Sequence, residues 1–240
     1  MHAPRFFCPR PLQPQQLIEL PETTAHHARR ALRLSDGEAV TLFDGHGGQY
    51  PATLSISGRQ VQAHIGDLEP VERELQGHIR LIQGIASGDK MDWVVEKAVE
   101  LGVAELYPVA ADRSVLKLAG LRLDKRLAHW RSIVCSASEQ CGRNRLMQIH
   151  EPTSLAQCLN TLQGTTLLCH PEGLRDLAAA LAAVNQELNL AVGPEGGWSP
   201  DEMRQAACQG WEGIRFGPRI LRTETAGIAL VASATALLGW

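Results

Sequence analysis

The chain has 240 residues, of which 44% are hydrophobic and 20% charged, and its formal net charge is −3 at pH 7. This composition is typical of a folded globular protein and excludes a disordered chain, and the length allows one large domain or two modest ones. The small negative charge argues against a nucleic-acid partner unless positive charge gathers on part of the chain.

Positive charge does gather, in two segments. The first 35 residues carry five arginines against two glutamates, and residues 113–145 carry eight Lys or Arg against two acids. Residues 146–213 reverse the sign, with eight acids against two arginines, which hides the basic segments in the total. The eight basic residues of the second segment are Arg113, Lys117, Arg122, Lys125, Arg126, Arg131, Arg143 and Arg145. The charge distribution therefore indicates a polyanionic partner.

Cysteine spacing and hydropathy exclude several other classes of protein. The six cysteines form no C-x-x-C pair and no zinc-type spacing, which fits a reducing compartment better than a secreted scaffold. His26-His27 has no third metal ligand at useful spacing. No signal peptide is recognisable, and the longest apolar run, 226–240, is too short to span a bilayer. We expect a soluble cytoplasmic protein with no metal and no membrane partner.

Up to about residue 70, short runs of alternating apolar and polar residues predict β-strands. One helix, residues 24–34, interrupts them, and the acidic, proline-containing segment 67–74 is the expected linker. We therefore expect a small β-barrel-like domain over residues 1–72. Its strands are expected at 39–43, 50–56 and 60–65.

After the linker, strands and helices alternate, which predicts parallel pairing in an α/β domain over residues 73–240. The final helix is apolar almost all round, so it should be buried in the core or against a second subunit. The expected strands are 79–85, 103–109, 165–169, 188–192 and 214–216. The expected helices are 89–101, 123–141, 174–184, 200–208 and 224–238.

Three glycine-containing loops follow strands of this domain, at 169–173, 193–197 and 217–226. Ligands bind at the carboxyl ends of parallel strands, and glycine lets the backbone approach them closely. The alternative is that Gly and Pro merely turn the chain. Three successive loops, two of them with Gly-Pro before a charged residue, favour a ligand pocket. The chain has neither the phosphate loop of NTPases nor G-x-G-x-x-G after the first strand, so the expected pocket for a nucleotide-type cofactor is not of either common kind.

Four segments are specific enough to identify a family: LAVGPEGGWSPDE, FGPRILRTETA, DKMDWVVEKAVELGV and ASEQCGRNR. Together they closely resemble the bacterial SPOUT-superfamily methyltransferases of the RsmE type, which modify the imide nitrogen of a uridine in 16S ribosomal RNA. The resemblance covers essentially the whole chain. It implies a PUA-like RNA-binding domain, then an α/β domain with a deep trefoil knot that holds S-adenosylmethionine in the three loops. It also implies a homodimer whose active site borders both subunits.

The resemblance assigns cofactor contacts to all three loops. Glu195 has another interpretation, as a cap of the following helix, and Leu221 and Ala226 have another as plain core residues. The expected contacts are Gly193, Pro194, Glu195, Gly196 and Gly197 on one wall, Ile220, Leu221, Thr223 and Ala226 around the adenine and methionine portions, and His170 and Pro171 at the edge.

Arg222 is the first candidate for catalysis and Arg219 the second. The imide N–H of uracil is a weak acid, so methylation there requires removal of a proton and stabilisation of negative charge on the flanking carbonyl oxygens. A guanidinium stabilises such charge with paired hydrogen bonds. The alternative is that Arg222 forms an ion pair with Glu224 or contacts a phosphate. Glu224 is the one candidate base, although a structural role is favoured for it.

The basic clusters in both domains predict contacts with 16S ribosomal RNA, within the small ribosomal subunit, although charged clusters are often only solvated surface. An RNA-binding assembly factor without catalytic activity is the alternative function, and the intact cofactor loops argue against it. A nucleotide-dependent hydrolase is disfavoured because the phosphate-loop lysine is missing. The expected phosphate contacts are Arg5, Arg29, Arg30, Arg33, Arg113, Arg143 and Arg145.

Overall fold

The computed structural model describes residues 3–58, 60–115 and 119–240. The chain divides into two compact units, the first formed by residues 1–74 and 138–146 and the second by 75–137 and 147–240. Lys117, one of the basic residues of the second segment, lies outside the described residues.

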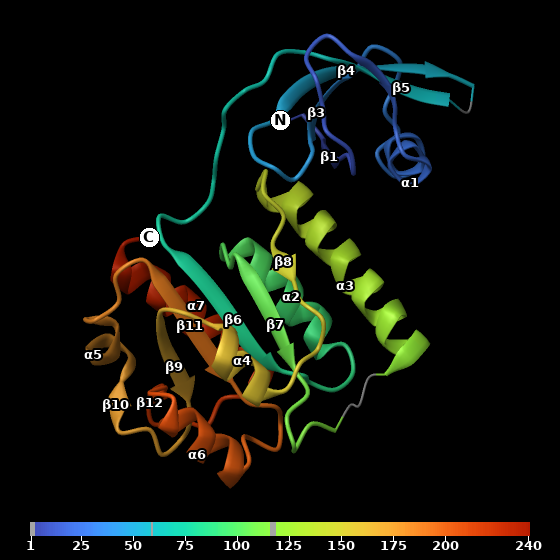
Figure 1. Ribbon diagram of the computed structural model, residues 1–240. Coiled ribbons are helices and arrows are strands. Elements are labelled where there is room, and N and C mark those ends of the chain that lie inside the picture. The colour runs from blue at the N-terminus through green and yellow to red at the C-terminus, as the bar shows by residue number, and fades with distance from the viewer. Residues whose placement is uncertain (1–2, 59, 116–118) are drawn as a thin grey trace. The chain divides into compact units, whose positions relative to one another are not determined.

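The first unit contains one five-stranded sheet, in the order β1-β3-β4-β5-β2 (Figure 1). β1 pairs with β3 in parallel, and the other neighbours pair antiparallel. The strands are β1 (Arg5–Phe7), β2 (Leu17–Glu19), β3 (Ala39–Phe43), β4 (Tyr50–Ser57) and β5 (Gln60–Ile65). The three predicted strands are confirmed, and the two edge strands β1 and β2 were missed.

Alternation in the sequence explains which face of this sheet is buried. In β4, Tyr50, Ala52 and Leu54 are buried while Pro51 and Thr53 are exposed. Because successive side chains of a strand point to opposite faces, this places every second residue in one core. Burial of that apolar face from water is the main stabilising contribution to the unit.

The helix predicted at residues 24–34 is present but shorter. It consists of α1 (Glu22–His26), continued by one π-helical stretch, η1 (His27–Ala31). The Leu32 amide donates to the His27 carbonyl, five residues back, which widens the helix at this point. Arg33 then adopts φ 54°, a left-handed conformation that ends the helix before Leu34.

The second unit is built on a seven-stranded sheet whose neighbours all pair in parallel, as predicted, in the order β10-β12-β9-β11-β6-β7-β8 (Figure 1). Strands β11 and β6 lie at its centre, and most of their residues are buried. The strands are β6 (His78–Gly84), β7 (Glu105–Val109), β8 (Gln148–Ile149), β9 (Thr165–Cys169), β10 (Arg175–Asp176), β11 (Glu187–Val192) and β12 (Glu212–Arg215).

Among the described residues, five helices connect these strands and a sixth, α7, follows the last of them; one of the predicted helices is wrong at its start. The expected helix 174–184 begins only at Leu177, because Arg175 and Asp176 pair with β12 and Asp176 caps the helix. β8, β10 and α4 were missed. The helices are α2 (Lys90–Glu100), α3 (Gly120–Cys141), α4 (Leu155–Thr161), α5 (Leu177–Leu181), α6 (Pro200–Cys208) and α7 (Thr223–Leu238).

Helix α7 packs against α2, α5 and the central strands β6 and β11. Ala226, Leu230, Val231 and Ala234 are buried there. The rest of the chain covers only part of the helix, because Leu237 remains 57% exposed, and burial against a second subunit stays a prediction. An apolar strip of α7 is therefore left for another surface to cover.

At the amino-terminal end of the sheet, Glu105 accepts four hydrogen bonds. His78 Nε2 and His150 Nε2 each lie 2.8 Å from its carboxylate oxygens, Arg80 Nε lies at 2.9 Å and the Tyr107 hydroxyl at 2.8 Å. Burial alone would raise the pKa of Glu105, but these four bonds outweigh it and lower the pKa to about 2. The carboxylate therefore favours the folded state at neutral pH.

Glu105→Gln should lower the free energy of unfolding most at neutral pH. Because the folded pKa lies below the ordinary value of 4.5, the stabilisation is complete above pH 4.5 and is lost as the pH falls towards 2. In urea unfolding at pH 7, the free energy of unfolding of the wild type should exceed that of the variant by up to about 3 kcal/mol. This difference should shrink between pH 4.5 and 2. The exposed Glu151→Gln is the control. A difference independent of pH would contradict the assignment.

Candidate functional site

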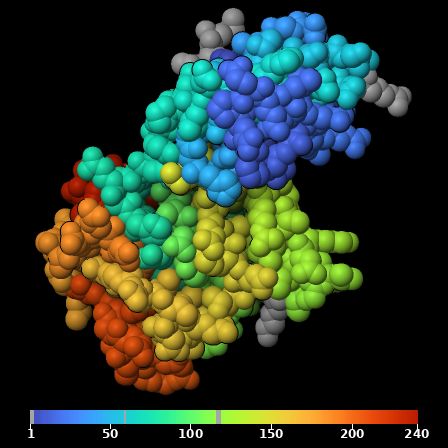
Figure 2. Space-filling view, turned by 45° about the horizontal axis from the view of Figure 1, so that its top comes forward, coloured from blue at the N-terminus to red at the C-terminus, as the bar shows by residue number. Residues whose placement is uncertain are grey.

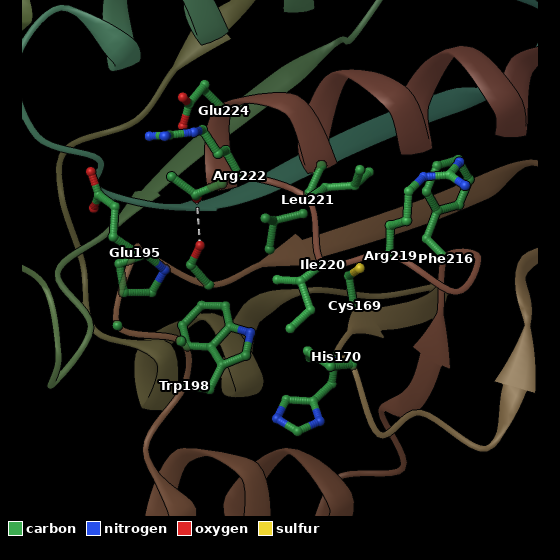
Figure 3. Close-up of a pocket in the computed structure, with 18 of the residues that line it drawn as sticks. Cys169, His170, Glu195, Trp198, Phe216, Arg219, Ile220, Leu221, Arg222 and Glu224 are labelled. Atoms are coloured by element: carbon green, nitrogen blue, oxygen red, sulfur yellow. Dashed lines mark hydrogen bonds between the residues drawn. The ribbon is translucent and has the colours of Figure 1, made fainter.

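A cavity of about 780 Å³ opens where β9, β11 and β12 end (Figure 3). All three loops singled out in the sequence line it, together with residues from two further segments. This volume suits a nucleotide-sized ligand. Of the expected residues, the cavity brings together His170, Pro171, Gly193, Pro194, Glu195, Gly196, Gly197, Arg113, Arg219, Ile220, Leu221, Arg222, Thr223, Glu224 and Ala226.

Thr223, the first residue of α7, joins two of these loops. Its hydroxyl donates to the Gly193 carbonyl at 2.6 Å and accepts from Gln83 Nε2 at 2.8 Å. Gln83 is fully buried in β6. One hydroxyl group therefore links the start of α7 to the residue after β11 and to the central strand β6, beside the cavity that Thr223 also lines.

The loop 193–197 lies so close to β6 that residue 84, at the end of that strand, must be a glycine. A Cβ at Gly84 would lie 2.3 Å from the Pro194 nitrogen, a distance that no side chain tolerates. Within the loop, Gly197 has φ 69°, and its amide donates to the Pro194 carbonyl to close a tight turn. The loop therefore lines the cavity with the backbone of its three glycines and with one long side chain, that of Glu195.

Glu195 does not cap α6, because Ser199 does so in a reciprocal capping box with Glu202. Glu195 instead accepts hydrogen bonds from the Ser87 amide (3.0 Å), the Ser87 hydroxyl (2.7 Å) and Lys90 Nζ (2.9 Å). Burial would raise the pKa of Glu195, but these bonds lower it to about 2, so the side chain is a carboxylate. The segment after β6 is thus a fourth strand-end contribution, which the sequence reading missed.

The charged groups at the cavity differ in how firmly they are held. Lys90 Nζ lies 3.9 Å from Glu224 Oε2, while no Arg222–Glu224 ion pair forms among the described residues. Arg219 and Arg222 are exposed and stand well apart, Arg219 towards Phe216 and Arg222 towards Glu224 (Figure 3). The alternative of an Arg222–Glu224 ion pair is therefore wrong for this structure, and both guanidiniums are available to a ligand.

Apolar side chains line the rest of the cavity. Trp198 is 3% exposed, and neither it nor Phe216 was anticipated from the sequence, whereas Cys169 belongs to the predicted loop 169–173. Burial raises the pKa of the Cys169 thiol to about 11, so it stays protonated and is no nucleophile at neutral pH. The Gly-Pro spacing that identified the loops carries no signal for Trp198 or Phe216, because each is an ordinary core-type side chain.

Two arginines expected to contact phosphate have other partners, and that expectation is corrected. Arg143 is 3% exposed, and its guanidinium forms two bonds with the Glu74 carboxylate, at 3.0 and 2.6 Å. The Arg5 guanidinium donates to Gln49 Oε1 and Asn144 Oδ1. Both hold the first unit together from inside, so neither is free to bind a phosphate.

The other basic candidates remain accessible. Arg29, Arg30 and Arg33 lie at the end of the first helix, with Arg30 and Arg33 exposed, and the Arg145 side chain is 53% exposed at 3.3 Å from Glu72. Arg113 donates to the Gly196 carbonyl at 3.3 Å and lines the cavity.

Over the described part of the chain, no three His, Cys, Asp or Glu side chains are grouped to hold a metal ion. In the same part, every helix is too short or too polar to cross a membrane.

Comparisons with known proteins give a consistent result. A family model described as an RNA methyltransferase domain matches residues 73–235, and one described as an RNA methyltransferase PUA domain matches residues 20–66. Ribosomal RNA small subunit methyltransferase E of Synechocystis sp. is 30% identical, over 94% of this chain and 76% of that protein. The enzyme of the same name from Bacillus subtilis is 29% identical, over 90% of each chain.

Two solved structures are similar over 98% of both chains. One is a ribosomal RNA small subunit methyltransferase E from Neisseria gonorrhoeae bound to S-adenosyl methionine, with 36% identity and a TM-score of 0.91. The other is a putative methyltransferase from Legionella pneumophila with the bound cofactor SAM, with 32% identity and a TM-score of 0.94.

Thr223→Val should lower the free energy of unfolding by about 2 kcal/mol, because valine has the same shape but leaves the Gly193 carbonyl and the Gln83 amide without their bonds. Thr223→Ser keeps the hydroxyl and should cost less. Urea unfolding of both variants measures this. Equal free energies of unfolding for the valine variant and the wild type would show that the hydrogen bonds of Thr223 do not stabilise the protein.

Proposed function

This chain belongs to the RNA methyltransferase family, of the ribosomal RNA small subunit methyltransferase E type, and we propose that it methylates the imide ring nitrogen of a uridine in 16S ribosomal RNA. It is an S-adenosylmethionine-dependent rRNA methyltransferase. The observation that carries the proposal is the cavity at the three strand ends, which two exposed arginines, Arg219 and Arg222, help to line.

The residues of the cavity fit S-adenosylmethionine. Its apolar walls suit the adenine ring, the exposed backbone of loop 193–197 offers hydrogen bonds, and charged side chains stand at one side. When bound, the cofactor supplies an electrophilic methyl group on a positively charged sulfur. The protein's own tasks are to orient the uracil, accept its imide proton and stabilise the resulting negative charge.

Arg222 is the residue we propose for charge stabilisation, and Arg219 is the second candidate. An exposed guanidinium can donate two hydrogen bonds to a carbonyl oxygen that becomes negative as the N–H proton leaves. Glu224 is the candidate acceptor for that proton. Its side chain is 17% exposed, and its Oε2 has no hydrogen-bond partner, so it retains capacity to accept one.

For RNA contacts we propose the accessible part of the predicted set: Arg29, Arg30, Arg33, Arg113 and Arg145. The N-terminal segment that carries the first three lies at the surface of the first unit, drawn in dark blue in Figure 2. Contacts with phosphates there make binding depend steeply on salt concentration. The small ribosomal subunit is the proposed particle.

We also propose a homodimer, built partly on α7. Ala232 and Ala236 are exposed on it, as is Leu237, and apolar helix surface of this kind is stabilised by a partner. Light scattering should give twice 26.1 kDa, and a monomer at micromolar concentration would exclude this interface. We further propose that residues 73–240 contain a trefoil knot and that the protein acts in the cytoplasm.

The proposed division of labour is RNA binding by residues 1–72 and methyl transfer by residues 73–240. The family matches over 20–66 and 73–235 support it.

Mass mapping of 16S ribosomal RNA from a strain that lacks the gene tests the function directly. One uridine should lose a methyl group at its ring nitrogen, and the purified protein with S-adenosylmethionine should restore it. Unchanged methylation in that strain would favour the alternative, an assembly factor without catalytic activity.

Arg222→Lys should lower the single-turnover rate of methylation by about two orders of magnitude, because lysine keeps the charge but loses the paired hydrogen bonds. Affinities for cofactor and RNA should change little. The variant's rate should rise with pH more steeply than the wild-type rate, because deprotonation in solution replaces the missing stabilisation. If Arg222→Lys is active and Arg219→Lys inactive, the two roles are reversed.

A further inference from the structure

One side of the cavity holds a lysine between two carboxylates. Lys90 Nζ lies 2.9 Å from Glu195 Oε1 and 3.9 Å from Glu224 Oε2, and its side chain is 30% exposed towards the cavity. Ser87 donates to the same oxygen of Glu195, which fixes that carboxylate from a third direction. These residues lie in the segments that follow three strands, β6, β11 and β12, so the tertiary fold brings them together.

The charges in this group are not fully matched with one another. An ammonium has three N–H donors, and Lys90 uses one on Glu195 while Glu224 stands too far away for a hydrogen bond. Glu224 Oε2 is enclosed and has no hydrogen-bond partner. A cation with donors to spare therefore lies beside a carboxylate with acceptors to spare, in a partly desolvated place where both interactions are strengthened.

The opposite side of the cavity carries more apolar side chains, although His170 and Arg219 also lie there. In Figure 3, Glu195 and Glu224 lie on one side, and Cys169, Phe216 and His170 lie on the other. A ligand that matches this polarity carries a flat apolar ring at one end and adjacent positive and negative groups at the other. The amino-acid end of the proposed cofactor is such a zwitterion.

We propose that Lys90 binds the α-carboxylate of the cofactor's amino-acid portion. The adenine ring then lies towards Cys169 and Phe216. This inference rests on the proposed function and adds an orientation for the cofactor. It makes Lys90 a specificity residue that distinguishes ligands with an amino-acid end from those without one.

The neighbouring cations suit this role less well. Arg113 is engaged with the Gly196 carbonyl, and Arg219 and Arg222 are exposed at the rim, where solvent screens their charge. Lys90 is the cation that a fixed carboxylate already holds in place, so a ligand that binds it pays little for ordering the side chain.

Two stable ligands separate this contact from the rest of the pocket. S-adenosylhomocysteine and 5′-methylthioadenosine share the adenosine and a neutral sulfur, but only the first carries the amino acid. By titration calorimetry, Lys90→Met should weaken S-adenosylhomocysteine binding about tenfold or more, the scale of a lost charged hydrogen bond. Binding of 5′-methylthioadenosine should change less than about twofold, which also shows that the variant is folded. Lys90→Arg should restore most of the affinity.

Lys97→Met is the matched control, on the same helix and paired with Glu96 and Glu100, and it should leave both affinities unchanged. If Lys90→Met weakens both ligands equally, or neither, the assigned orientation is wrong while the proposed function stands. If the wild type binds neither ligand, the proposed function fails, and this inference fails with it.

Discussion

The site depends on one hydroxyl group. Thr223 holds the start of α7 against the Gly193 carbonyl and against Gln83, which lies inside the central strand β6. Loops that cradle a ligand through their backbone have few side chains of their own to define their spacing. The buried hydrogen bonds of Thr223 fix the distance between the two loops, because hydrogen bonds are strong only over a narrow range of separations. Arg222 precedes Thr223 and Glu224 follows it, so the hydrogen bonds of Thr223 also position these two residues.

The cavity divides into parts with separate tasks. In the proposed arrangement, the apolar side chains around Trp198 would contact the adenine ring, Lys90 would bind the cofactor's carboxylate, and the exposed Arg222 would stabilise charge on the uracil. Cofactor binding and methyl transfer would then depend on different cations. Lys90 can be held by carboxylates and still bind the cofactor. Arg222 needs its N–H groups free, because it is proposed to stabilise negative charge on the uracil.

Much of the fold was predictable because the local signals were strong. The strand Ala39–Phe43 and the helix Pro200–Cys208 were placed correctly by alternation and by a Ser-Pro cap. The edge strands, such as Arg175–Asp176, are too short to show a period, so only their neighbours define them. The final helix was predicted to be buried in the core or against a second subunit, but composition alone cannot say which of its faces the rest of the chain covers.

The same limit applies to the site. Glycine and proline at strand ends predicted the three loops, since those residues are constrained by the backbone itself. Lys90 was missed because its loop lacks the Gly-Pro pattern, and its importance comes from Glu195, 105 residues away. Arg143 was assigned to RNA on its charge alone, whereas its partner Glu74, 69 residues away, makes it structural. Pairing across such distances is set by the tertiary fold and leaves no local pattern.

The most direct test of this account is the affinity of Thr223 variants for S-adenosylhomocysteine, measured by calorimetry at a temperature where each variant is folded. If the hydrogen bonds of Thr223 position the loops, Thr223→Val should bind about tenfold more weakly than the wild type, the scale of about 1.4 kcal/mol, and Thr223→Ser should stay close to the wild type. Wild-type affinity in the folded valine variant would contradict the claim that these hydrogen bonds hold the loops in their binding arrangement.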